Sequence, residues 1–241
     1  MWRFRPARDL DLAPGARFRS VRREPGLVGA LLHGGWRLLV RLYLGLFHRF
    51  RVVGGEHLPT AAPFVLVANH ASHLDALALG ALLPPALGSR TYALAAGDVF
   101  FEHDGLAAFA SLVLNALPMR RKKASVADLK ELRARLVEEP CVLVLFPEGT
   151  RVKDGRMIPF KPGIGMLVAA AAVPVVPCHI DGAYAAMPPG SRLPRPRRIT
   201  VRVGVPRTFA DQPNDKAGWL AIAKDLEDRV AGLATAPPTG C

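Results

Sequence analysis

Cysteine is scarce in this sequence. The three cysteines, Cys141, Cys178 and Cys241, are an odd number without C-x-x-C spacing, and two of them lie inside apolar runs. A disulfide framework is therefore not expected, and we expect a reducing, cytoplasmic environment. The first 25 residues are rich in arginine and interrupted by three prolines, so we expect no secretory leader there.

Acidic residues are too few to balance the basic ones. The 20 aspartates and glutamates face 32 lysines and arginines, which gives a formal net charge of +12. Such a chain attracts phosphorylated small molecules, acidic lipid surfaces or nucleic acid, and charge alone does not choose among them. Aromatic residues make up only 7% of the chain and form no stacking stripe, and we find no RNA-binding motif. We therefore expect no nucleic-acid partner.

The chain also lacks a long hydrophobic run that is free of charge. Residues 26–47 approach the length of about 20 that a membrane-spanning helix needs. Arg37 and Arg41 lie near the middle, however, and offset the gain from the leucines. At 100° per residue, one stripe contains His33, Arg37, Arg41 and His48, and the opposite side contains Leu31, Leu32, Leu38, Leu39, Leu42 and Leu46. This pattern predicts an amphipathic helix at the membrane interface. A helix packed on the protein's own core is the alternative.

The chain divides into four parts. Residues 1–25 are a basic arm with seven arginines against three acidic residues, residues 26–50 contain the amphipathic helix, residues 51–235 are one domain, and residues 236–241 are a flexible tail. The arm either lies on an anionic bilayer or is a disordered or loosely docked tail. The 241 residues, half of them hydrophobic, suffice for one domain with a sizeable core.

Short apolar runs alternate with helical patterns beyond residue 51. Strands are predicted at residues 64–68, 92–96, 141–146, 173–180 and 199–205, and helices at residues 72–83, 125–138, 163–172 and 216–233. The first and third runs are almost wholly apolar, as in a sheet covered on both faces. We therefore predict an α/β fold with a mixed, largely parallel sheet flanked by helices, and the amphipathic helix as an N-terminal appendage.

An imidazole and a carboxylate follow the first predicted strand. His70 lies on the loop and Asp75 in the first helical turn, so the carboxylate can orient the ring and leave its other nitrogen free to take a proton. Ser72 and Asp75 also match a capping box, so Asp75 alternatively serves only the helix start. His73 completes a possible metal-ligand set with His70 and Asp75, but the spacing is not that of a standard zinc helix, and no metal is expected.

A second polar junction, F-P-E-G-T-R at residues 146–151, follows the third predicted strand. Glu148 can accept hydrogen bonds, Gly149 allows a ligand close to the backbone, Thr150 offers a hydroxyl, and Arg151 has a planar fork that suits phosphate. Lys161 adds a cation at a predicted helix N-terminus, where amide groups also favour anions. A further candidate cation is Arg120, although the three basic residues after it are typical of a solvated face.

Four blocks in this order resemble the glycerolipid acyltransferases, the PlsC-like lysophospholipid acyltransferases. The blocks are N-H-x-x-x-x-D at residues 69–75, Arg120, F-P-E-G-T-R at residues 146–151 and V-P-V-V-P at residues 173–177. The resemblance implies a glycerol-3-phosphate acyltransferase-like fold, with the acyltransferase domain at residues 51–235. It also implies His70 as general base and Asp75 as its orienting partner. The residues that fall where the family binds the glycerol phosphate are Arg120, Glu148, Gly149, Thr150 and Arg151. Val152 and Cys178 depart from the family's usual residues.

The expected reaction follows from this resemblance. An acyl group passes from acyl-CoA or acyl-carrier protein, without another cofactor, to a hydroxyl of a lysophospholipid, with 1-acylglycerol 3-phosphate as the first expected acceptor and phosphatidic acid as product. The chain would act at the cytoplasmic face of an anionic membrane as a peripheral or monotopic protein. Another lyso-lipid, an ornithine-type lipid or a glycolipid is the alternative acceptor, and a metal-dependent hydrolase is a more distant alternative.

Overall fold

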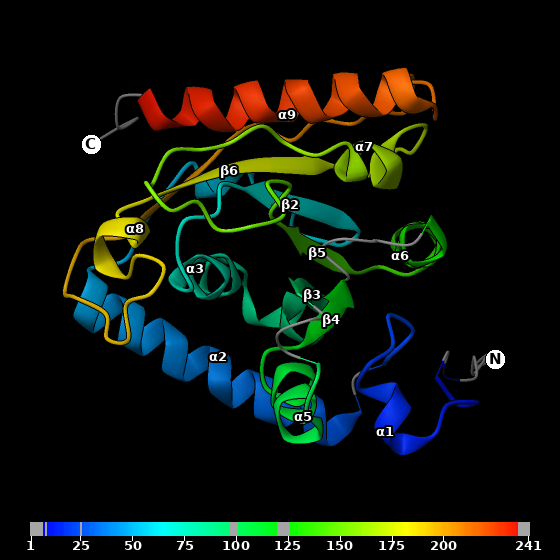
Figure 1. Cartoon of the computed structure of the whole chain (residues 1–241), viewed down its shortest axis with the longest axis horizontal. Coiled ribbons are helices and arrows are strands. Elements are labelled where there is room, and N and C mark those ends of the chain that lie inside the picture. Colours follow the sequence, from blue (N-terminus) through cyan, green and yellow to red (C-terminus); the bar gives the residue numbers. More distant parts are fainter. Residues whose placement is uncertain (1–6, 8, 25, 97–100, 120–125, 236–241) are drawn as a thin grey trace.

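The computed structural model of the chain describes residues 7, 9–24, 26–96, 101–119 and 126–235 (Figure 1). The predicted site residue Arg120 and the predicted tail 236–241 lie outside the described residues. In the described part, seven strands form one sheet in the order β1-β7-β6-β2-β5-β3-β4. Their bounds are β1 Arg51–Val53, β2 Phe64–Ala68, β3 Thr91–Ala96, β4 Ala116–Met119, β5 Val142–Leu145, β6 Val175–Asp181 and β7 Thr200–Val203.

Neighbouring strands run parallel, except that β6 and β7 are antiparallel. The helices are α1 Pro14–Arg17, α2 Leu27–His48, α3 Leu74–Leu82, α5 Asp104–Leu112, α6 Val126–Glu138, α7 Gly163–Val168, α8 Ala183–Ala186 and α9 Lys216–Thr235. One face of the sheet packs against α6, α7 and α9, and the other packs against α2, α3 and α8 (Figure 1). The predicted mixed sheet with helices on both faces is confirmed.

Two strands, β1 and β4, and three α-helices, α1, α5 and α8, were not predicted. β1 has only three residues, of which two are exposed, and β4 has four residues including Pro118. Both lie at the edges of the sheet, where a proline is tolerated because the strand has one neighbour instead of two. The helix α5 packs beside β4 and α2. Short, partly polar edge strands carry too weak a pattern to be recognised in the sequence alone.

Helix α2 packs on the protein through its polar stripe. Its buried residues are Gly29, His33, Arg37, Val40, Leu44 and His48. Arg37 and Arg41 donate hydrogen bonds to carbonyl oxygens of Gly80, Ala81 and Leu83 at the end of α3, which have no partners inside that helix. The leucines of the opposite side stay exposed, Leu31 by 68% and Leu46 by 84%. The helix therefore does pack on the core, but with the polar stripe inward and the leucine side outward.

No helix in the described ranges combines the length and the apolar character needed to cross a bilayer.

Much of the predicted basic arm, residues 9–24, is docked on the protein. Arg135 is almost fully buried and donates hydrogen bonds to the carbonyl oxygens of Val21 (2.9 Å) and Arg23 (2.8 Å). Arg23 in turn donates to Oδ1 of Asn115 at 2.7 Å. Of the two alternatives for the arm, docking holds for these residues, and contact with a bilayer stays a prediction.

Replacing Gly165 by alanine should destabilise the protein, because a Cβ at this position of α7 would lie 2.4 Å from the backbone of Trp219 in α9. The two helices would have to move apart, and we expect a loss of about 2 kcal/mol in the free energy of unfolding. Urea unfolding measures this loss. Gly232→Ala is the matched control, because that glycine is helical and a Cβ there meets nothing within 4 Å. Equal stability of the two variants would contradict the close approach.

Candidate active site

His70 and Asp75 are in direct contact, as the spacing predicts. Nδ1 of His70 lies 3.0 Å from Oδ2 of Asp75, and the same oxygen accepts the backbone N–H groups of Ala71 and Ser72, each at 2.7 Å. Because this oxygen accepts all three bonds, the His70 proton sits on Nδ1 and Nε2 keeps its lone pair. The arrangement leaves Nε2 able to take a proton from a bound molecule.

Asp75 serves the helix start as well as the imidazole. Its carboxylate accepts the amide of Ser72, which is one half of a capping box. The other half differs, since Oγ of Ser72 accepts the amide of Leu74 at 3.1 Å and donates to the carbonyl oxygen of Met187 at 2.8 Å. The two alternatives for Asp75 are thus combined in one side chain, which is 1% exposed.

The segment after β5 holds the backbone of His70 from both sides. The N–H of His70 donates to Oε1 of Glu148 at 2.7 Å, and its carbonyl oxygen accepts the N–H of Val152 at 2.9 Å. The imidazole also stacks on the ring of Phe146, with centroids 4.1 Å apart. Because β2 and β5 are adjacent parallel strands, the loops at their carboxyl ends lie side by side. Two blocks about 75 residues apart in the sequence thus form one unit.

Asn69 has a structural role that the sequence did not predict. Its Oδ1 accepts the N–H of Ile180 at 2.8 Å and its Nδ2 donates to the carbonyl oxygen of the same residue at 3.0 Å. This pair joins the end of β2 to β6. The only signal in the sequence is its place directly before His70.

Glu148 is fully buried, and both of its carboxylate oxygens bond to backbone amides. Oε1 accepts the N–H of His70, and Oε2 accepts the N–H of Ile158 at 3.1 Å. Burial raises the pKa of Glu148 to about 7, partly offset by these two bonds. The resemblance predicted a contact with the acceptor. In the structure this carboxylate bonds to the protein's own backbone and is not among the residues that line the cavity described below, so a contact with the acceptor stays a prediction.

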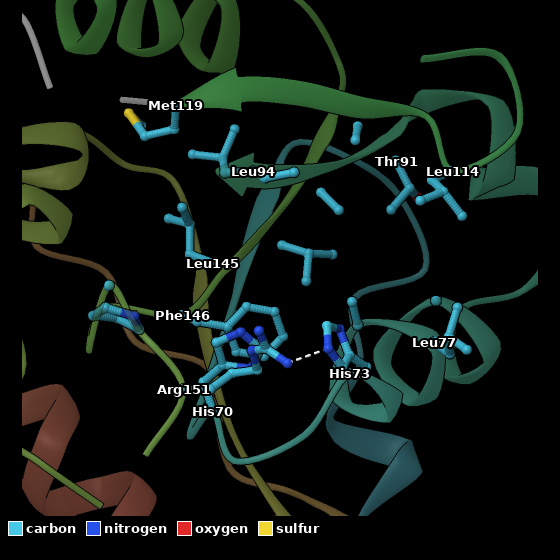
Figure 2. Close-up of a pocket in the computed structure, with 18 of the residues that line it drawn as sticks. His70, His73, Leu77, Thr91, Leu94, Leu114, Met119, Leu145, Phe146 and Arg151 are labelled. Atoms are coloured by element: carbon cyan, nitrogen blue, oxygen red, sulfur yellow. Dashed lines mark hydrogen bonds between the residues drawn. The ribbon is translucent and has the colours of Figure 1, made fainter. Parts of the chain in front are cut away.

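A cavity of about 350 Å³ opens beside His70. Gly149, Thr150, Arg151 and Lys161, all predicted site residues, line it together with His70. Gly149 has φ +71°, and a Cβ there would lie 2.6 Å from Nζ of Lys161, so this position favours glycine. The remaining wall is mainly apolar and comes from α2, α3, β3, β4, α6, β5 and α7, although His33 and Arg37 of α2 also line it. In Figure 2 the rings of His70, His73 and Phe146 gather with Arg151, and Leu94 and Met119 lie away from them.

His73 lines the same cavity and contacts Arg151. The Arg151 guanidinium donates a hydrogen bond to Nε2 of His73 (Figure 2). Burial, and next the positive charge of Arg151, lower the pKa of His73 below its ordinary value. The alternative metal site is disfavoured by these contacts, since Nδ1 of His70, Oδ2 of Asp75 and Nε2 of His73 all have protein partners. Within the described residues, no three His, Cys, Asp or Glu side chains are placed to share a metal ion.

Comparisons with known proteins identify the family of this chain. A family model described as Acyltransferase matches residues 49–181, more than half of the chain. The crystal structure of PlsC from Thermotoga maritima, a 1-acyl-sn-glycerophosphate (LPA) acyltransferase, aligns with a TM-score of 0.65. The chain belongs to the PlsC-like acyltransferase family. The alignment with PlsC covers 86% of this chain and 80% of that one at 22% identity, so this likeness concerns the fold. The resemblance seen in the sequence and the predicted fold class are confirmed.

Relatives of this PlsC-like chain include three named 1-acyl-sn-glycerol-3-phosphate acyltransferases. The alpha enzyme of Homo sapiens is 33% identical over 131 residues, which is 54% of this chain and 44% of the human one. The Limnanthes douglasii protein is 31% identical over 167 residues, 69% of this chain and 57% of its own. The Chlamydomonas reinhardtii protein is 33% identical over 198 residues, 78% of this chain and 56% of its own. The chain spans about half the length of these relatives.

The buried Glu148 carboxyl group should make stability depend on pH. Its pKa in the folded protein, about 7, lies above its ordinary value of 4.5. The protonated form therefore stabilises the fold, and the free energy of unfolding should fall by about 3 kcal/mol as pH rises from 4.5 to 7. Glutamine does not titrate, so Glu148→Gln should remove this dependence of the free energy of unfolding on pH, as measured by urea unfolding between pH 4.5 and 8. The exposed Glu56→Gln should keep the dependence. The same pH dependence in the wild type and in both variants would contradict the assignment.

Proposed function

We propose that this protein transfers a fatty acyl group from an acyl thioester to the free hydroxyl of 1-acylglycerol 3-phosphate, giving phosphatidic acid. The observation that carries the proposal is the His70 and Asp75 pair, whose free Nε2 borders a cavity with cations near the imidazole and an apolar wall beyond it. The names of the relatives support this acceptor. The donor is acyl-CoA or acyl-carrier protein, and no other cofactor is needed for the chemistry.

His70 acts as the general base in this proposal. Its Nε2 takes the proton of the acceptor hydroxyl while that oxygen attacks the thioester carbonyl carbon. The carbon–sulfur bond then breaks, and the imidazolium gives the proton to the departing thiolate. The products are an ester and a free thiol, and the enzyme forms no acyl intermediate because the acceptor oxygen is the nucleophile. Asp75 holds the ring in the required tautomer and stabilises the imidazolium.

The cavity supports one orientation of the two substrates. Arg151 and Lys161 supply positive charge close to His70, where the phosphate of the acceptor would bind. The acyl chain of the acceptor would lie along the apolar wall, against Leu77 of α3 and Leu94 of β3. A phosphate and a hydrocarbon chain thus each meet the surface that suits them, and the hydroxyl lies between them at the imidazole.

The exposed side of α2 supports attachment to an anionic membrane at its cytoplasmic face. Its leucines form an apolar strip, and four exposed arginines, Arg192, Arg195, Arg197 and Arg198, lie on a segment tied to the end of this helix. Nδ1 of His48 bonds to the carbonyl oxygen of Arg197 at 3.0 Å. No acidic residue occurs between Asp181 and Asp211. Leucines in the lipid and arginines at the headgroups are the pattern of an interfacial helix.

His70→Ala should lower kcat for acylation of 1-oleoylglycerol 3-phosphate by about a thousandfold or more, because the base is removed. Asp75→Asn should also lose most activity, since the ring is no longer held in its tautomer. Mass spectrometry of the product with acyl-CoA and with acyl-carrier protein measures both. His103→Ala is the control, because this exposed histidine makes no capping bond at the start of α5. Substantial turnover by His70→Ala, or transfer only to acceptors without a phosphate, would overturn the mechanism or the acceptor, respectively.

Replacing Leu31, Leu38, Leu42 and Leu46 together by serine should weaken vesicle binding at least about tenfold, because the apolar area that enters the lipid is lost. Co-sedimentation with vesicles containing phosphatidylglycerol measures the affinity. The control is Val137→Ser with Leu220→Ser, which are also exposed but lie on α6 and α9 over the opposite face of the sheet. An equal loss of vesicle affinity in both variants, or no loss in the leucine variant, would show that α2 is not the membrane attachment.

A further inference from the structure

His73 has a place in the site that the proposed reaction does not use. It is the residue directly before α3, and its side chain makes no capping bond to that helix. Its Nε2 instead accepts a hydrogen bond from Arg151, and both side chains line the cavity beside His70. The imidazole therefore forms part of the cavity wall and does not cap the start of α3.

Burial first, and then the positive charges near His73, favour a neutral ring when no anion is bound, and the Asp75 carboxylate opposes them. Arg151 approaches it from the segment after β5, His70 from the loop after β2, and Asp75 from α3. Lys161 lines the same cavity from the segment before α7. An Nε2 that accepts a bond from a guanidinium carries no proton of its own. A second positive charge here becomes favourable only when an anion enters.

We infer that His73 takes up a proton when a dianionic phosphate binds to Arg151, and that it thereby selects a phosphate monoester over a phosphodiester as acceptor. This inference rests on the proposed function and names the headgroup that the site prefers. Arg151 turns its N–H groups to the phosphate, Nε2 of His73 gains one proton from solvent, and the ring becomes a second donor to the same anion.

The number of charges on the phosphate decides the size of the effect. A monoester carries about −1.5 to −2 at pH 7, whereas a diester carries a single charge. The additional negative charge stabilises the imidazolium and its charge-assisted hydrogen bond. Lysophosphatidic acid would therefore gain a contact that lysophospholipids with a substituted phosphate do not gain.

The test compares two acceptors that differ by one methyl group, 1-oleoylglycerol 3-phosphate and its methyl phosphodiester, in detergent with acyl-CoA. His73→Gln should lower the ratio of kcat/KM between monoester and diester roughly tenfold, and the change should appear as a higher KM for the monoester. In the wild type, KM for the monoester should rise with pH above neutrality, by up to about tenfold per unit, because one proton is taken up on binding. His73→Gln should flatten this dependence.

His73→Lys separates charge from shape. A fixed positive charge should keep the preference for the monoester and also flatten the pH dependence of KM. The inference is overturned if His73→Gln keeps both the ratio and the pH dependence. It is also overturned if this variant lowers kcat equally for both acceptors with KM unchanged, because His73 would then act in the chemical step.

Failure of the proposed function would be visible separately. If the wild type acylates neither acceptor, calorimetry with glycerol 3-phosphate and its methyl ester decides the inference, in two buffers of different ionisation enthalpy. Proton uptake with the monoester that is absent in His73→Gln supports the inference, and binding of the monoester without proton uptake, or equal uptake with the methyl ester, overturns it.

Discussion

The arrangement of the site depends on how the backbone of His70 is held. Its N–H bonds to Glu148 and its carbonyl oxygen to the amide of Val152, so the loop after β2 cannot move without the segment after β5. The pairing of β2 with β5 in parallel register makes this contact possible. The stacking on Phe146 and the bond to Asp75 follow from it, because both need the ring at one fixed place. Glu148 therefore acts on the imidazole through the main chain.

Helix α2 connects the cavity to the outer surface. Its arginines satisfy carbonyl oxygens at the end of α3, which would otherwise be buried without partners. Once Arg37 and Arg41 face inward for this reason, helical geometry forces the leucines on the other side outward. The inner side of the same helix supplies Trp36 and Val40 to the cavity wall. The apolar outer strip and the shape of the cavity are thus consequences of one set of hydrogen bonds.

The sequence was sufficient to predict the strands of the sheet centre and the contact of His70 with Asp75, because apolar runs and short spacings are local signals. It was not sufficient to predict which side of α2 faces the protein. A helical wheel separates two sides, but the carbonyl oxygens that attract Arg37 belong to α3, some 40 residues later. The burial of Glu148 and the contact of His73 with Arg151 likewise depend on which strands are neighbours. Such pairings become visible only in three dimensions.

The distribution of charge along the cavity supports one orientation of the proposed lipid acceptor. Cationic groups gather near His70, and the wall beyond them is formed by residues such as Leu94 and Met119 (Figure 2). In the proposed reaction, a lysophospholipid placed in reverse would move its phosphate away from Arg151 and Lys161 and its hydrocarbon chain toward these cations, which is unfavourable for both groups. In this proposed orientation, the free hydroxyl of the acceptor lies next to the imidazole of His70. The orientation in this proposal therefore follows from where the cations Arg151 and Lys161 lie relative to His70.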